Sequence, residues 1–160
     1  LRGGGQESNC RAGTENIIGS AGFGAAAQAA QRDVEAGRWD DVTELRNILE
    51  KTIEDTTQLT TFVGKGVQRL PNTSCILTPG WKGETQVMQM DLAGFAISAG
   101  SACSSGKVRA SRVLQAMGFD DIAASSAIRV SLGPKTTKDE IDRFGEAWLT
   151  QHERIRERAA

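Results

Sequence analysis

The cysteine at position 103 lies in a segment where a thiol has little to pack against. The segment SAGSACSSGKV, residues 98–108, places Cys103 among serine, alanine and glycine. A thiolate nucleophile needs solvent access, partial deprotonation and freedom to reach its target, and small neighbours permit both access and motion. Lys107 and Arg109 follow closely and would favour the thiolate. Composition alone leaves two interpretations open, a nucleophile and a passive surface thiol in a turn, because most cysteines are buried and inert.

The other two cysteines carry weaker signals. Cys75 stands beside Ile76 and Leu77 in a strand-like run, which favours a structural role. Cys10 lies in a glycine-rich segment that indicates no particular role. The sequence has no Cys-x-x-Cys pair and a single histidine, His152, so we expect no zinc or iron–sulfur site built from this chain. Three cysteines without a disulfide framework are typical of a reducing compartment, which predicts a cytoplasmic protein.

Arg129 is the second candidate for chemistry. Within AIRVSLG, residues 127–133, the apolar Ile128, Val130 and Leu132 alternate with polar residues, which is the period of a half-buried strand. Arg129 is therefore expected to point away from the core, where its guanidinium fork could hold a carboxylate. The alternative is an arginine paired with a surface acid, which is the commoner use of such a residue.

A glycine-rich segment, GGGQESNCRAGT at residues 3–14, leads into a helix expected to begin at about Asn16. Backbone amides and the Thr14 hydroxyl near a helix start suit a phosphate group. The segment matches neither the Walker-type nor the dinucleotide-binding glycine pattern. A flexible linker is therefore the alternative interpretation.

Five helices are expected to position these segments. Alanine favours the first over residues 16–37, and Asp40 or Asp41 would cap the second, whose apolar residues recur at helical spacing. A capping box of Thr137 and Glu140 would begin the last. The other expected helices cover residues 85–93 and 109–117, the second of these closed by Gly118.

Four short strands complete the expected fold, at residues 60–64, 74–78, 95–100 and 127–133. Helices followed by strands mixed with helices predict a small α/β or α+β layer. A length of 160 residues, with 39% hydrophobic and 24% charged residues, fits one domain, or one domain plus a piece of another. A net charge of −1 gives no bulk electrostatic reason to bind nucleic acid or an anionic membrane. No apolar run approaches the ~20 residues that span a bilayer.

Taken in order, these segments resemble the carboxyl-terminal part of a cysteine desulfurase, a pyridoxal-phosphate enzyme of the class V aminotransferase family. The GSACSSG block resembles the long-loop branch of that family. The resemblance implies the small carboxyl-terminal domain of a fold-type I enzyme, an α/β domain with a short mixed or antiparallel sheet and helices packed on it. Residues 1–35 would be the end of the large cofactor-binding domain with its connecting helix, and residues 36–160 the small domain. The matching segments are GGGQE and RAGTEN within 3–16, RLPNTSCI (69–76), FAISAGSACSSG (95–106), VLQAMG (113–118) and SAIRVSLGPKTTKDEID (126–142).

The family's functional residues fall on positions already identified. By resemblance, Cys103 is the nucleophile that accepts sulfur from L-cysteine as a persulfide, leaving L-alanine. Arg129 matches the residue that holds the substrate carboxylate. Thr14 matches the residue that reaches the cofactor phosphate of the neighbouring subunit in a homodimer. The resemblance also implies a sulfur-acceptor protein, either an iron–sulfur scaffold or a carrier for thio-modification.

The resemblance also shows what this segment lacks. In the family the cofactor-binding lysine follows a histidine, and no lysine of this chain does, so the fragment alone is expected neither to hold pyridoxal phosphate nor to turn over cysteine. The opening at Leu1 without a methionine suggests a piece of a longer protein. Ser111-Arg112 stands where many relatives have Ser-His, outside the expected chemistry. The alternatives are a selenocysteine lyase-like homologue and a non-catalytic sulfur-relay or scaffold module.

Overall fold

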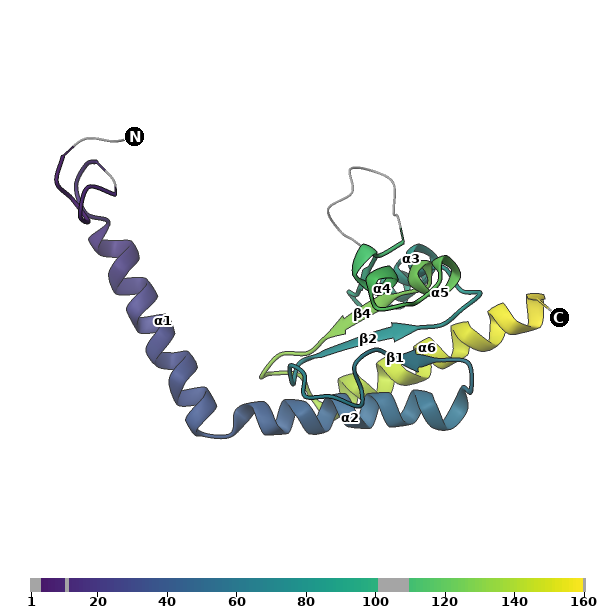
Figure 1. The fold of residues 1–160 in the computed structure, drawn as a ribbon. Coiled ribbons are helices and arrows are strands. Elements are labelled where there is room, and N and C mark those ends of the chain that lie inside the picture. Colours follow the sequence, from purple (N-terminus) through teal and green to yellow (C-terminus); the bar gives the residue numbers. More distant parts are fainter. Residues whose placement is uncertain (1–3, 11, 101–109, 160) are drawn as a thin grey trace. The chain divides into compact units, whose positions relative to one another are not determined.

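The computed structural model describes residues 4–10, 12–100 and 110–159 (Figure 1). The chain divides into two compact units, Leu1–Arg38 and Trp39–Ala160. The assignment of residues 1–35 to a larger cofactor-binding domain, and of 36–160 to a small domain, stays a prediction. None of the helices in the described part of the chain is long and apolar enough to cross a membrane.

The first unit consists of an irregular segment and the helix α1 (Ile17–Glu35). The Asn16 side chain caps this helix by accepting a hydrogen bond from the backbone N–H of Gly19 at 3.0 Å. The helix ends before Gly37, whose φ of 70° suits a residue without a side chain. No residue of α1 is buried, so its alanine content, rather than packing within this unit, accounts for the helix. The helix predicted from the sequence is confirmed.

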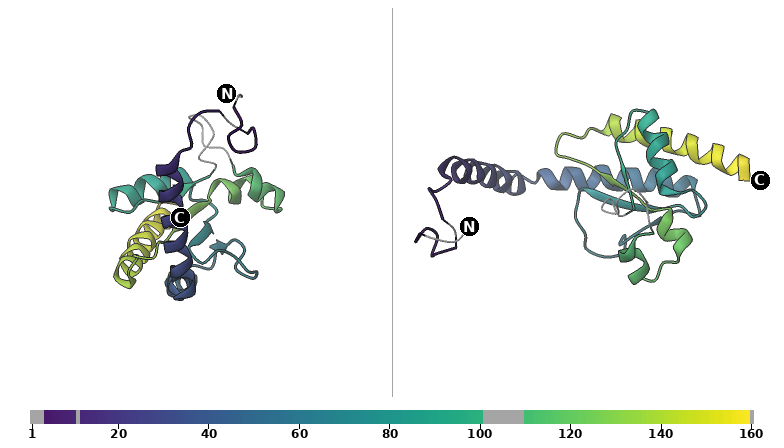
Figure 2. Two further views of the ribbon diagram at one scale, coloured as in Figure 1. Left: turned by 90° about the vertical axis from the view of Figure 1, so that its left-hand side faces the viewer. Right: turned by 90° about the horizontal axis from the view of Figure 1, so that it is seen from above.

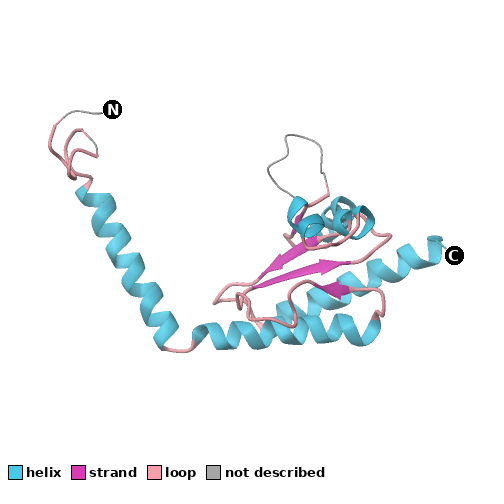
Figure 3. Ribbon diagram, viewed as in Figure 1, coloured by secondary structure: helices cyan, strands magenta, loops and turns pink. Residues whose placement is uncertain are grey.

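The second unit is built on a sheet that, within the described residues, has four strands (Figure 3). The strand order is β1-β2-β4-β3, and every neighbouring pair is antiparallel, which confirms the α/β prediction and selects antiparallel over mixed pairing. The strands are β1 (Thr61–Phe62), β2 (Thr73–Leu77), β3 (Ser98–Ala99) and β4 (Ile128–Ser131).

Two strands are much shorter than the sequence predicted. Strand β1 holds only two of the five residues expected at 60–64. Strand β3 holds only two of the six residues expected at 95–100. The reason lies in the preceding helix α3 (Gly83–Leu92), whose end captures Phe95 through a hydrogen bond from its N–H to the Met90 carbonyl at 2.8 Å. With Gly94 at a φ of 87°, this is a Schellman cap, and it uses residues that would otherwise extend the strand.

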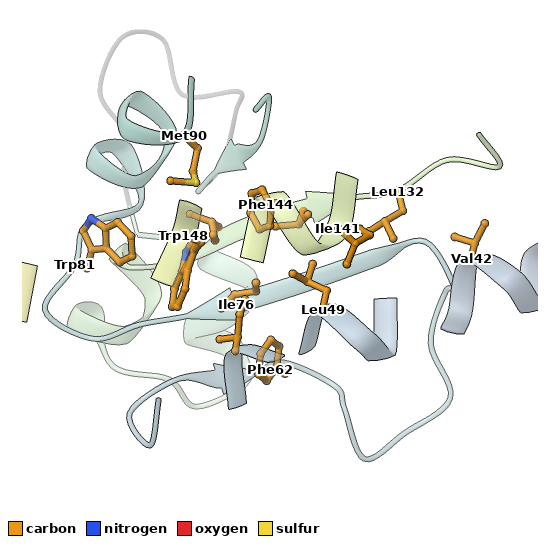
Figure 4. Packing of buried hydrophobic residues seen from close by; sticks show 13 residues of the cluster. Val42, Leu49, Phe62, Ile76, Trp81, Met90, Leu132, Ile141, Phe144 and Trp148 are labelled. Atoms are coloured by element: carbon orange, nitrogen blue, oxygen red, sulfur yellow. The ribbon is translucent and has the colours of Figure 1, made fainter. Parts of the chain in front are cut away.

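One face of the sheet carries the main hydrophobic core, beneath α2 (Arg38–Thr56), α3 and α6 (Lys138–Ala159) (Figure 4). The apolar stripe predicted for the second helix is confirmed, because α2 supplies buried residues to this cluster, as α6 does too. Its buried members are Val42, Leu49, Ile53, Phe62, Ile76, Trp81, Met90, Ile128, Val130, Leu132, Ile141, Phe144 and Trp148.

The other face of the sheet is covered at one end by α4 (Arg112–Ala116) and α5 (Asp121–Ser125), and Figure 2 shows these helices across the sheet from α3 and α6. A second buried cluster of Leu77, Leu114, Ala124 and Ala127 holds them there. The helix α5 was not predicted, because five residues are too few to show a helical period.

Two predicted helix starts need correction. The helix α2 begins at Arg38, directly after the turn at Gly37, so Asp40 and Asp41 lie in its first turn rather than at its cap. In that turn their carboxylates still interact favourably with the helix dipole. In the described chain α4 begins at Arg112, where the Ser111 hydroxyl accepts from the Leu114 N–H at 3.4 Å.

Two predicted helix boundaries are confirmed. The predicted closure of α4 at Gly118 is present, with a φ of 93°. The capping box before α6 is also present, since the Thr137 N–H donates to the Glu140 carboxylate at 2.8 Å and the Glu140 N–H to the Thr137 hydroxyl at 3.3 Å.

Candidate functional site

Strand β4 presents Arg129 on the face of the sheet opposite the main core. Ile128 and Val130 on either side of it are buried, whereas Arg129 is exposed. Successive side chains of a strand point to opposite faces, so burying the apolar pair in the core turns the guanidinium outward. This is the orientation expected from the sequence, and the role of Arg129 in binding stays a prediction.

Arg129 lies between two register partners on the neighbouring strands. Cys75 of β2 is opposite it on one side, and Ser98 of β3 is opposite it on the other. Residues directly opposite each other in a sheet have their side chains on the same face. The three side chains therefore form a row across the sheet on the face away from the main core, which we call the Arg129 row.

No carboxylate forms an ion pair with Arg129 within the part of the chain that the structure describes. The predicted alternative of a surface ion pair is therefore not what the described residues form. The positive charge does act on its neighbour in the row: burial raises the pKa of the Cys75 thiol, and the Arg129 charge partly offsets that rise. A guanidinium without an internal counter-ion is available to an external anion.

Cys103 lies outside the described residues, but the chain on both sides of its segment is placed. Before it, β3 ends at Ala99, and the Gly100 N–H donates to the Ala127 carbonyl at 3.4 Å. After it, Ala110 packs against the second cluster, on the face that carries the Arg129 row. The described residues on either side, Gly100 and Ala110, thus both lie next to Ala127 or its cluster, directly before β4.

The structure also places two other residues singled out in the sequence, Cys75 and Thr14. Cys75 is half-buried and packs against the second cluster, which agrees with its predicted structural role. Thr14 is exposed and stands two residues before the cap of α1, in the first unit. Its predicted contact with a phosphate of a neighbouring subunit stays a prediction.

The described residues do not form a complete pyridoxal-phosphate site. Lysines that form Schiff bases are usually activated by desolvation or by a neighbouring cation. The described lysines are instead exposed, and two of them pair with acids, Lys65 with Glu54 and Lys138 with Asp142, both at 2.5 Å. The described lysines therefore lack the surroundings that activate a Schiff-base lysine.

A buried ionic cluster anchors the second unit away from the Arg129 row. The Glu50 carboxylate of α2 accepts two hydrogen bonds from Arg69, at 2.7 and 2.5 Å, and one from the Ser74 hydroxyl of β2 at 2.6 Å. Burial alone would raise the pKa of Glu50, but the hydrogen bonds and nearby positive charges outweigh it and lower the pKa. The cluster joins α2, the loop after β1 and the core face of β2. It is a structural anchor.

A second buried polar group, the Gln86 side chain, joins α3 to α6. Its amide nitrogen donates to the Trp81 and Ser126 carbonyls, each at 2.9 Å, and its oxygen accepts from the Trp148 indole at 3.1 Å. Next to it, the His152 ring stacks on the Trp148 ring, with centroids 5.3 Å apart. Burial is the main cause that lowers the pKa of His152. These contacts support packing.

Comparison with known proteins gives the class of this chain. Residues 4–144 match the family described as aminotransferase class-V. The chain therefore belongs to the class-V aminotransferase family. That family was the one indicated by the sequence motifs, and the match covers both the first unit and most of the second.

Relatives within this family bear a more specific name. The chain is 43% identical over 146 residues to a protein named cysteine desulfurase from Cereibacter sphaeroides, covering 91% of this chain and 37% of that protein. It is 40% identical over 143 residues to the cysteine desulfurase NifS of Azotobacter vinelandii, covering 89% of this chain and 35% of that protein. The chain thus spans little more than a third of the length of these relatives.

A solved structure supports the same fold. The X-ray structure of a NifS-like protein from Rickettsia africae matches with a TM-score of 0.81 and 31% identity, covering 96% of this chain and 39% of that one. The sheet and helices described above are therefore the arrangement of this family's fold, and the shared part is again a limited share of the longer chain.

Proposed function

We propose that this chain is the carboxyl-terminal part of a pyridoxal-phosphate-dependent cysteine desulfurase, which converts L-cysteine to L-alanine and passes the sulfur to Cys103. The observation that carries the proposal is the identity of 40–43% with relatives named cysteine desulfurase, over 89–91% of this chain. The structure adds an exposed arginine whose neighbour on one side, Ser98 of β3, shortly precedes the Cys103 segment in the sequence.

In this proposal the chain supplies two of the enzyme's groups. Arg129 binds the carboxylate of L-cysteine through its guanidinium fork, which fixes the orientation of the substrate. The Cys103 thiolate attacks the substrate sulfur. The new S–S bond forms as the Cβ–S bond breaks, the electron pair stays on Cβ, and protonation there gives the methyl group of alanine. Cys103 then holds the sulfur as a persulfide.

The rest of the enzyme would hold the cofactor. When bound, pyridoxal phosphate supplies the electron sink that weakens the Cβ–S bond. Thr14 would contact its phosphate in the neighbouring subunit of a homodimer. We further propose a cytoplasmic location, and a protein acceptor that takes the sulfur from Cys103 for iron–sulfur cluster assembly or thio-modification.

The test uses the full-length parent enzyme loaded with pyridoxal phosphate. With L-cysteine and a reductant, we expect equal amounts of alanine and sulfide, and a persulfide on Cys103 detected by mass spectrometry of the trapped peptide. Cys103→Ala should abolish the persulfide and sulfide release, whereas Cys10→Ala should leave both unchanged. Unchanged persulfide formation in Cys103→Ala would refute the assignment. Turnover of L-selenocysteine without L-cysteine would identify a selenocysteine lyase instead.

A further inference from the structure

The Arg129 row contains two side chains that the proposed chemistry has not used, Cys75 and Ser98. Both are half-buried, and both face the same side of the sheet as the guanidinium. An arginine side chain carries about 2 kcal/mol of rotamer entropy, so a binding arginine benefits from neighbours that restrict it. The row supplies such a neighbour on each flank.

The two flanking pairs differ in geometry. The Leu132 N–H donates to the Asn72 carbonyl at 2.8 Å, which marks these opposite residues as a hydrogen-bonded pair of β2 and β4. Because pair types alternate along an antiparallel ladder, Cys75 and Arg129 form a non-hydrogen-bonded pair, whose side chains are the closer kind. Gly100 and Ala127, which adjoin β3 and β4, are a hydrogen-bonded pair. Ser98 and Arg129 lie two residues further along this ladder, so they also form a hydrogen-bonded pair, which is the more widely spaced type.

These geometries suit two different roles. The closer neighbour, Cys75, is fixed on its other side by the second hydrophobic cluster, so it can support the arginine stem. The wider spacing of the Ser98 pair suits a carboxylate oxygen that is bound by the Ser98 hydroxyl and the guanidinium together. Ser98 has no side-chain hydrogen bond within the described residues, so its hydroxyl is available as a donor. A carboxylate has about four lone-pair sites. The arginine fork fills two, and a hydroxyl can fill a third.

We infer that the substrate-carboxylate site is the whole Arg129 row, in which the Ser98 hydroxyl binds the carboxylate beside Arg129 and Cys75 positions the arginine. The inference rests on the proposed function for the identity of the ligand. It assigns Ser98 as a specificity residue and Cys75 as a positioning residue. Both precede the Cys103 segment, which is not part of the inferred site. The part of the inference that concerns geometry, the proximity of Cys75 to the Arg129 charge, can be tested on this chain without the cofactor.

The first experiment measures alkylation of Cys75 in a Cys10→Ser, Cys103→Ser background, where it is the sole thiol. Iodoacetate and iodoacetamide differ mainly in charge, so the ratio of their rates reports the local potential and cancels changes in thiolate fraction. Arg129→Met should lower this ratio by about threefold, as expected for one charge at roughly 6 Å in a high dielectric. Arg143→Met, which removes an exposed charge on α6, is the matched control. An unchanged ratio in Arg129→Met overturns the positioning half.

The second experiment measures kcat and KM for L-cysteine in the full-length parent enzyme. Ser98→Ala should raise KM about 10-fold with little change in kcat, the loss expected for one hydrogen bond to a charged group, and Ser98→Thr should recover much of it. Arg129→Ala should raise KM about 100-fold or more. If Arg129→Ala leaves KM unchanged, the proposed carboxylate site is wrong. If Arg129→Ala raises KM but Ser98→Ala does not, only the role of Ser98 is wrong.

A pair of isosteric variants tests Cys75 in the same assay. Cys75→Asp would place a carboxylate beside Arg129 and compete with the substrate, whereas Cys75→Asn has the same shape without the charge. We expect KM to be about 10-fold higher in Cys75→Asp than in Cys75→Asn, with similar kcat and similar melting temperatures. Equal KM values in two folded variants would overturn the role of Cys75.

Discussion

The backbone of Gly83 lies so close to the carbonyl of Ala127 that a β-carbon on Gly83 would stand 2.5 Å from that oxygen. The same β-carbon would meet the Ala99 side chain at 3.1 Å. Helix α3 therefore begins in direct contact with strand β3 and with the residue before β4, and only glycine allows this approach. The contact fixes the end of β3 from which the Cys103 segment departs.

Gly83→Ala should consequently destabilise the second unit. Because the nearest atoms belong to the backbone and to a short side chain, neither can rotate away, and overpacking of this kind costs about 1–3 kcal/mol. Urea denaturation of the chain, followed by tryptophan fluorescence, measures the loss. Gly133→Ala is the control, since a β-carbon there would meet nothing within 4 Å. Equal midpoints for the two variants would contradict the close approach.

The ionic cluster around Glu50 predicts a strong effect of removing one charge. Glu50→Gln leaves Arg69 half-buried without its carboxylate, and breaking a buried pair from one side costs about 3–5 kcal/mol. Glu54→Gln, which removes the exposed partner of Lys65, should cost less than about 1 kcal/mol. Denaturant unfolding of both variants at neutral pH provides the comparison. If Glu50→Gln lowers the free energy of unfolding as little as Glu54→Gln does, the Arg69 guanidinium is hydrated in the variant and the prediction is wrong.

The same carboxylate predicts the acid sensitivity of the fold. The folded pKa of Glu50 lies below its ordinary value of 4.5, so its contribution is fully present above pH 4.5 and is lost as the pH falls through the folded pKa. Unfolding free energies measured from neutral pH downward should decline over this range. The decline should be shallower in Glu50→Gln. An identical pH profile in that variant would assign the acid sensitivity to other carboxylates.

Much of the fold was predictable from the sequence because local signals agreed with packing. The capping box at Thr137, the closing Gly118 and the alternation around Arg129 each have a local cause, and each appears in the structure. The length of β3 was not predictable. It is set by the cap of α3, which takes Phe95 by a hydrogen bond to Met90.

The sequence predicted single residues of the site but not which residues lie next to one another. The period of the strand gave the outward direction of Arg129. Its neighbours Cys75 and Ser98 lie 54 and 31 positions earlier in the chain. They meet it only because β4 is inserted between β2 and β3 in the sheet. Strand order depends on the core that α2, α3 and α6 form together, and no local pattern encodes it.

The buried amide of Gln86 predicts a loss of stability when its hydrogen bonds cannot be formed. Gln86→Leu keeps the volume but leaves the Trp148 indole and the carbonyls of Trp81 and Ser126 without these partners, and each unsatisfied buried group costs about 1–3 kcal/mol. Gln89→Leu is the control, because Gln89 accepts a single hydrogen bond, from the Trp81 indole. Thermal unfolding should show a clearly larger loss for Gln86→Leu. Equal losses would contradict the role of Gln86 in joining α3 to α6.

His152 predicts a second, milder pH dependence. Burial is the main cause of its lowered pKa, the nearby charge of Arg156 lowers it further, and Glu153 acts in the opposite direction. Since the unfolded chain binds a proton near pH 6.5 and the folded chain resists it, stability should fall as the pH drops below 6.5. His152→Phe keeps a ring against Trp148 and removes the titration, so its stability should be flat from pH 7.5 to 6. Proton NMR of the imidazole gives the folded pKa directly, and a value at or above 6.5 would contradict the prediction.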